Sequence, residues 1–273
     1  MKKYKYLPIF VLLVGLSIFF SSCEKVIEID LNSKEPQIVI EGNITNLQGP
    51  YTVIITQTVN FNDVNNFPPV SGATVTISDN IGNSETLTET SSGVYVTSTI
   101  QGVCNRNYTL KVLSNDKEYI ATSYMHAPVN IDTLTIVTET THNGSKKTIS
   151  VGFTDPEGIS NYYRFIKTIN NISQTTIYVE DDLLQDGNAI SHPLLSKYQD
   201  ETSIKYGDDV VISLQVIDKD VYDYFRTLSQ LSGGSGLINQ STSPANPISN
   251  FNNGALGYFN AYSVTFKELT INK

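Results

Sequence analysis

The histidines are the side chains best suited to metal or acid–base chemistry, and they lie far apart in the sequence. His126, His142 and His192 form no His-x-x-x-His or Cys-x-x-Cys pattern, so their spacing indicates no zinc site. Residues 233–237 (Gly-Gly-Ser-Gly-Leu) lack the final glycine of a nucleophile elbow and follow a predicted helix, whereas that motif needs a strand before it. The sequence therefore predicts no catalytic residue, no cofactor and no metal, and we expect a protein that is not an enzyme.

Two acidic groups offer the oxygen ligands that calcium prefers. Residues 180–182 (Glu-Asp-Asp) with Asp186 form one group, and Asp208 with Asp209 forms the other. Neither spacing matches an EF-hand loop, and acidic turns are commonly only solvated. A carboxylate pair for glycoside hydrolysis stays an open alternative, because the separation of such a pair is a property of the folded chain.

The first residues of the chain have the pattern of an export signal. Three lysines precede an apolar run over residues 7–20, and Ser21 and Ser22 then lead to Cys23. This segment resembles the lipobox of bacterial lipoproteins, although Phe20 stands where leucine is more usual. The resemblance implies a signal peptide over residues 1–22, lipidation of Cys23 and a tether over residues 23–36. An ordinary secretory signal with a chance cysteine is the alternative.

Charge and cysteine content restrict the partners and the covalent links. The formal net charge is −9, and no basic run is longer than Lys146-Lys147, so a nucleic-acid partner has no electrostatic support. If Cys23 carries lipid, then Cys104 has no cysteine partner within the chain. We interpret Cys104 as a partly buried turn residue, because only Arg106 is close enough in sequence to activate a thiol.

The segment 37–126 is predicted to be a β-sandwich. Short alternating runs recur over residues 37–42, 51–56, 74–78, 93–96, 108–112 and 118–121, and residues 79–83 supply turn chemistry. Residues 69–77, 93–95 and 108–112 resemble prealbumin-like and carboxypeptidase-regulatory-like modules, which implies an Ig-like sandwich. In such a fold Tyr108 is expected to be a corner tyrosine that bonds the backbone.

The segment 127–273 is predicted to be a second antiparallel β domain with one packed helix. Strands are expected over residues 148–153, 162–167, 176–179, 210–216 and 257–270, with irregular structure over 181–208. Asp218 can cap a helix over 219–231, in which Val221, Tyr224, Phe225, Leu228 and Leu231 form one apolar stripe. The chain as a whole is therefore expected to be mainly β.

A family resemblance spans nearly all of the chain after the signal. Residues 247–251 (Pro-Ile-Ser-Asn-Phe) and 254–262 (Gly-Ala-Leu-Gly-Tyr-Phe-Asn-Ala-Tyr) are similar to the C-terminal signature of a Bacteroidota lipoprotein family, DUF4249. Residues 23–29, residues 72–75 and Asp155-Pro156 fit the same family. The resemblance implies an outer-membrane lipoprotein associated with TonB-dependent transporters or their partner lipoproteins, and it supplies no catalytic residue.

These observations lead to one functional hypothesis with two alternatives. We expect a non-enzymatic lipoprotein at the outer membrane, with the cell surface favoured over the periplasmic face, that acts as an accessory or ligand- and partner-binding subunit of a TonB-dependent uptake system. Long loops on a β scaffold commonly carry binding, so Phe61, Phe67 and Phe251 are the candidate partner contacts, within the segments 61–67, 181–208 and 237–251. Asp132-Thr133-Leu134 is similar to an O-glycan acceptor, which makes Thr133 a possible modification site. A structural or adhesive surface module and a hydrolase are the alternatives.

Overall fold

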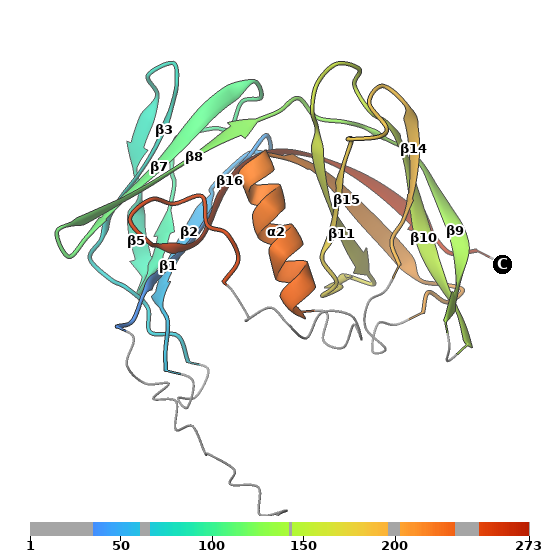
Figure 1. Ribbon diagram of the computed structural model, residues 1–273, viewed down its shortest axis with the longest axis horizontal. Helices are drawn as coiled ribbons and strands as arrows, with labels where there is room; N and C mark the ends of the chain where they lie inside the picture. Colours follow the sequence, from blue (N-terminus) through green and yellow to red (C-terminus); the bar gives the residue numbers. More distant parts are fainter. Residues whose placement is uncertain (1–34, 61–65, 142–143, 196–202, 233–245, 273) are drawn as a thin grey trace, which may run out of the picture. The chain divides into compact units, whose positions relative to one another are not determined.

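A computed structural model describes residues 35–60, 66–141, 144–195, 203–232 and 246–272 of the chain. Residues Pro36–Lys273 form one compact unit (Figure 1). The described residues are mainly β and contain a single helix, as the sequence predicts. Their elements, in chain order, are β1 (Ile38–Thr45), β2 (Thr52–Gln57), β3 (Thr74–Asp79), β4 (Ser84–Thr86), β5 (Thr88–Ser91), β6 (Val94–Val96), β7 (Arg106–Ser114), β8 (Lys117–Met125), β9 (Ile131–Thr141), β10 (Gly144–Thr154), β11 (Tyr162–Ile169), β12 (Ile172–Ser173), β13 (Tyr178–Asp181), β14 (Ala189–Pro193), β15 (Asp209–Ile217), α2 (Lys219–Ser232) and β16 (Leu256–Thr270).

One long sheet connects the two predicted β segments. This nine-stranded sheet has the order β12-β11-β15-β16-β1-β2-β6-β5, with β13 paired to β11. A four-stranded sheet, β4-β3-β7-β8, and a three-stranded sheet, β14-β10-β9, pack against it through two separate hydrophobic cores. Two sandwiches therefore share one continuous sheet.

The last strand, β16, is the element that joins the sandwiches. Its residues from Leu256 to Tyr262 pair in parallel with β1, and its residues from Ser263 to Thr270 pair antiparallel with β15. Because side chains alternate between the faces of a strand, Phe259 and Ala261 enter the first core, whereas Tyr258 and Tyr262 point to the opposite face. Residues from both predicted segments thus contribute to the first core. The boundary at residues 126 and 127 stays a prediction.

The side chain of Asn46 closes the point where β1 leaves β16. Its Oδ1 accepts from the Val264 N–H (2.8 Å), and its Nδ2 donates to the Val264 carbonyl (3.4 Å). One amide side chain therefore satisfies the two backbone groups that the departing strand exposes.

The helix α2 covers the face of the long sheet opposite the two smaller sheets. The Asp218 carbonyl accepts the first helical bond, from the Tyr222 N–H (2.9 Å), which places Asp218 at the predicted N-cap position, and its side chain accepts from the N–H groups of Lys219 (2.7 Å) and Tyr124 (3.0 Å). Val221, Tyr224 and Phe225 are buried on one stripe, but Leu231, which the same spacing includes, is 43% exposed. The Arg164 guanidinium lies 3.9 Å from the centre of the Phe225 ring beneath the helix. Among the described residues, no helix has the length and apolar character needed to cross a membrane.

Candidate partner-binding site

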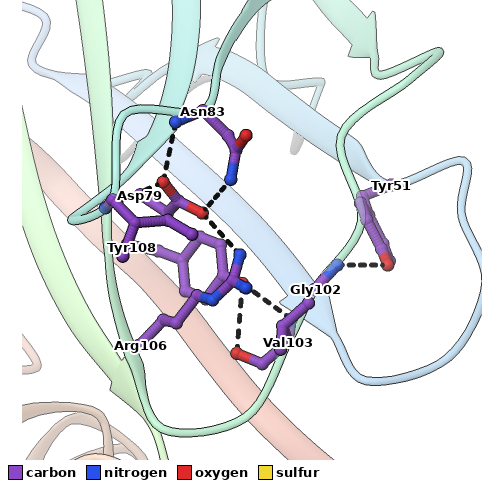
Figure 2. A network of polar contacts seen from close by, with 8 residues as sticks. Tyr51, Asp79, Asn83, Gly102, Val103, Arg106 and Tyr108 are labelled. Carbon is purple, nitrogen blue, oxygen red and sulfur yellow. Dashed lines mark hydrogen bonds and ion pairs between the residues drawn. The ribbon is translucent and has the colours of Figure 1, made fainter.

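A polar network fixes one end of the first sandwich (Figure 2). Asp79 ends β3, and its carboxylate accepts from the N–H groups of Ile81 (3.1 Å) and Asn83 (2.8 Å) and from the Asn83 side chain (2.6 Å). Arg106, the first residue of β7, adds an ion pair of 2.9 Å to the same carboxylate. Burial raises the pKa of Asp79, but the bonds from Asn83, Ile81 and Arg106 outweigh it and lower the pKa below its usual value. The predicted turn over residues 79–83 is thus confirmed.

Two buried tyrosines bind the loop that precedes β7. The Tyr108 hydroxyl accepts from the Val103 N–H (2.7 Å) and donates to the Val103 carbonyl (3.1 Å), so its predicted role as a corner tyrosine is confirmed. The Tyr51 hydroxyl accepts from the Gly102 N–H (2.9 Å) and lies 2.6 Å from the Leu47 carbonyl oxygen. Both hydroxyls hold backbone in place, and neither is assigned chemistry (Figure 2).

A polar hollow of about 490 Å³ lies beside this network, lined by Gly82, Asn83, Ser84, Thr99, Ile100, Gln101, Val103 and Arg106. Its one charged lining residue, Arg106, already pairs with Asp79. Nearby, Glu85 accepts bonds from residues 98–100. Burial raises the pKa of Glu85, but the bonds from Ser98, Ile100 and Thr99 outweigh this effect and lower it to about 2. Several groups that line the hollow, among them Arg106, Asn83 and Thr99, are therefore already bonded to the neighbouring carboxylates of Asp79 and Glu85.

In the second sandwich, three carboxylates meet between two loops. Their oxygens, from Asp155, Asp182 and Asp186, lie within 4.8 Å of one another. Asp155 follows β10, whereas Asp182 and Asp186 follow β13, and the first two side chains are buried. We refer to residues 155–161 and 181–188 as the loop pair. The sequence indicated Asp182 and Asp186 as possible oxygen ligands, but it gave no signal that Asp155 joins them.

Each of these carboxylates accepts at least one hydrogen bond from the protein. Asp155 accepts from the Tyr163 hydroxyl and from the Gly187 N–H (3.1 Å). Asp182 accepts from the Asn161 N–H (2.7 Å), and Asp186 accepts from the Gly158 N–H (2.7 Å). Carboxylate oxygens at this spacing are of the kind that Ca²⁺ takes, but these bonds give the cluster a structural role, because each one crosses from one loop to the other or to β11.

Burial and mutual repulsion perturb the groups in the cluster. The pKa of Asp182 is raised above its usual value, first by burial and then by the negative charges of Asp155 and Asp186, against the opposing bond from Asn161. The pKa of Tyr163 is also raised, by burial and by the hydroxyl bond and charge of Asp155. The Tyr163 hydroxyl is thus a donor that stays protonated.

The loop pair displays apolar side chains to solvent. Leu183 is 81% exposed, Leu184 is 90% exposed, and Ile159 of the other loop is 53% exposed. We call these three residues the apolar tip. The backbone beneath them is fixed, since the Gln185 N–H donates to the Asp182 carbonyl (2.7 Å) and the Asn188 N–H to the Gln185 carbonyl (2.9 Å). A fixed turn that exposes adjacent leucines is suited to contact with another apolar surface.

The strand registers place the apolar tip at one end of the long sheet. Asp181, where the second loop begins, pairs with Tyr162 at the start of β11. The next residue of β11, Tyr163, pairs with Val216 of β15, and Val216 pairs with Ser263 of β16. The residue before Ser263 pairs with Thr45, the last residue of β1, so the loop pair lies level with the C-terminal end of β1. The folded unit begins at Pro36, at the opposite end of β1. Eight residues of strand separate those two ends by about 23 Å. In Figure 1 the loops above β11 and β14 correspondingly lie at the top, and the chain enters β1 at the bottom.

The predicted partner contacts lie in different environments. Phe67 is 52% exposed, as a contact residue requires. Phe251 is 8% exposed and packs in the first core, so its ring cannot contact a partner while the protein is folded; the prediction for Phe251 is corrected in this respect. Phe61 and Cys23 lie outside the described residues. The prediction of irregular structure over 181–208 is also corrected, because β14 lies within it.

Thr133, Cys104 and His192, which the sequence singles out, each lie beside other parts of the fold. Thr133 is exposed on β9 beside Gly152, and its glycosylation stays a prediction. Cys104 is partly buried against the first core, and burial raises the pKa of its thiol, which disfavours the reactive thiolate. The His192 ring stacks on Phe165 at 5.2 Å, and its Nδ1 lies 3.3 Å from Glu180 Oε2.

The fold defines a mainly β protein in which two sandwiches share a sheet and one pair of loops carries an apolar tip. Its family follows from a comparison of the sequence with family models. The chain belongs to the family described as domain of unknown function (DUF4249), whose model matches residues 24–268. This match confirms the family resemblance found in the sequence. No curated protein matches the chain.

Proposed function

We propose that this protein is a lipid-anchored outer-membrane protein that binds another protein through the apolar tip. In this proposal it is a non-enzymatic accessory or partner-binding subunit of a TonB-dependent uptake system, and Cys23 carries the lipid. The observation that carries the proposal is the pair of adjacent leucines, Leu183 and Leu184, which are 81% and 90% exposed on a turn fixed by buried carboxylates. Single exposed apolar side chains are common on protein surfaces, whereas adjacent ones on a fixed turn form a patch suited to contact with another surface.

The position and charge of the tip favour a protein partner over a lipid surface. The tip lies at the end of the sheet opposite the entry of the chain at Pro36, whereas a membrane-anchored chain meets its membrane through the N-terminal tether. Exposed Glu157 and Asp186 also lie in the two loops that carry the tip. Their charges repel anionic lipid headgroups and favour a partner whose apolar contact is bordered by lysine or arginine.

The test is capture of partners from outer membranes with a tagged native protein in mild detergent. The variant Leu183→Ser with Leu184→Ser is compared with a matched control, Ile81→Ser with Ile172→Ser, which removes two exposed aliphatic side chains elsewhere (63% and 68% exposed). We expect the parent and the control to retain a TonB-dependent transporter or a partner lipoprotein and the leucine variant to lose it. Equal capture by all three proteins would refute the role of the tip.

Failure of the anchor is distinguished by a separate measurement. Incorporation of labelled palmitate and partition into detergent are compared between the parent and Cys23→Ala. We expect both signals to be lost in the variant. A parent that takes up no label and stays in the aqueous phase would refute the lipid anchor and leave the test of the tip intact.

A further inference from the structure

The strand β9, of 11 residues, forms one edge of the three-stranded sheet in the second sandwich. In the described part of the chain, β9 pairs only with β10, at the end of the three-stranded sheet. Lys267 Nζ covers the start of this edge by donating to the carbonyls of Ile131 (3.2 Å) and Asp132 (2.7 Å). Beyond these two residues, the outer edge of residues 133–138 pairs with no further strand in the described ranges, and to such an edge another strand can add.

The sequence of this edge has few of the features that prevent strand addition. Six of the eight residues from Thr133 to Thr140 are Thr, Ile or Val, which suit a strand, and none is Lys or Pro. Ile136, in the middle of the edge, is 42% exposed. The bulge at Asp132 and the cover by Lys267 both lie at the start of the strand, so residues 133–138 form a β-prone edge without a lysine, a proline or a bulge.

We propose that β9 pairs with β9 of a second copy of this chain, antiparallel about a twofold axis at Ile136 or Val137. Charge favours this occupant: the ribbon of β9 and β10 carries Asp132 and Glu139 with Lys146 and Lys147, and so is neutral, whereas the whole chain has a net charge of −9. Two copies therefore meet where their repulsion is smallest. If the axis passes through Ile136, Glu139 lies opposite Thr133 of the other copy; if it passes through Val137, Glu139 lies opposite Thr135. In neither register do two like charges face each other. Two three-stranded sheets become one six-stranded sheet, in an isologous contact.

Cysteine crosslinking tests this pairing directly in the full chain, purified in mild detergent. Residues opposite each other in an antiparallel pair have Cα atoms about 4.5–5.5 Å apart, which a disulfide can span. We expect Ile136→Cys or Val137→Cys, whichever lies on the axis, to give a crosslinked dimer under mild oxidation. Ile172→Cys, on the edge strand β12, is the control: Ile172 is more exposed (68%) than Ile136 (42%), yet the variant should give no more crosslink than the parent with its native cysteines.

A second variant tests the energetics without new covalent links. Val137→Lys places two lysines at the axis of the dimer, or one residue to either side of it if the axis lies at Ile136. We expect it to raise the dimer dissociation constant by about tenfold or more, while Ile172→Lys leaves it unchanged. Sedimentation over a concentration series measures this constant, and unfolding midpoints verify that both variants fold. A monomeric parent, a dimer insensitive to Val137→Lys, or crosslinking only at the control position would each overturn the proposal.

Discussion

Asp155 is the residue on which the geometry of the loop pair depends most. Its side chain is buried, and it accepts from the buried Tyr163 hydroxyl and from the Gly187 N–H. Replacing Asp155 by Ala leaves the Tyr163 hydroxyl without an acceptor, at a cost of about 1–3 kcal/mol, and removes a second, charge-assisted bond of similar worth. We expect the free energy of unfolding to fall by about 2–4 kcal/mol, a large part of the stability of a domain.

A double-mutant cycle separates this bond from the rest of the site. Tyr163→Phe removes the donor together with its need for a partner, so Asp155→Ala should cost less in the Tyr163→Phe background than in the parent. We expect a coupling energy of about 1–2 kcal/mol. Urea unfolding at pH 7, followed by fluorescence and circular dichroism, gives the four free energies.

Asp186 is the control for Asp155, because its side chain is exposed whereas that of Asp155 is buried. Asp186 is exposed and accepts a bond from the Gly158 N–H, so Asp186→Asn should cost less than about 1 kcal/mol. Hydrogen exchange in residues 182–188 should rise in Asp155→Ala, because the Gly187 N–H loses its acceptor. Additive costs of Asp155→Ala and Tyr163→Phe, or an unchanged midpoint in Asp155→Ala, would refute the assigned role.

Three further predictions concern single groups. The pKa of Glu85 is lowered from 4.5 to about 2 in the folded protein, so its stabilising contribution is present above about pH 4.5 and is lost as the pH falls toward 2. In a series of urea unfolding midpoints measured at different pH values, Glu85→Gln should remove this pH dependence. The pKa of Asp182 is raised from 3.8, so its contribution to stability has the opposite sign and is lost as the pH rises through the folded pKa. The stability of the parent relative to Asp182→Asn should therefore decline from pH 3 to pH 7. A difference that stays constant over this range would contradict the raised pKa. Tyr108→Phe removes both bonds to Val103 and should lower the free energy of unfolding by about 1–2 kcal/mol, and an unchanged thermal midpoint would count against the corner role.

Local patterns in the sequence predicted most of the elements, because each pattern has a local cause. Alternation over 74–78 and 108–112 gave β3 and β7, and Asp218 with an apolar stripe gave α2 from 219 to within one residue of its end. The role of Tyr108 was predictable because it bonds a backbone segment five residues away. Leu231 belongs to the predicted stripe by its spacing but is 43% exposed, since spacing says which residues share a helix face and does not say which of them other residues cover.

Long-range pairing could not be predicted in the same way. The single strand β16 pairs with β1, more than two hundred residues earlier in the chain, and with β15, and nothing in the local pattern of either partner specifies the other. Phe251 illustrates the consequence for the site. An aromatic residue in a polar loop resembles a surface contact in the sequence, but the parallel pairing of β16 brings its loop against the first core and buries it.

The sequence by itself determined the mainly β class and the family, because short patterns of residue type define these properties, and the export signal with lipidation at Cys23 stays a prediction from the same kind of pattern. Only the tertiary structure decided which carboxylates meet, since Asp155 reaches Asp182 and Asp186 through the pairing of β11 with β13. It also decided which apolar residues remain outside: Leu183 and Leu184 have the same chemistry as buried leucines, and their exposure follows from the bonds that fix the turn beneath them. Burial depends on which surfaces meet in the folded chain, and the spacing of residues along it does not contain that information.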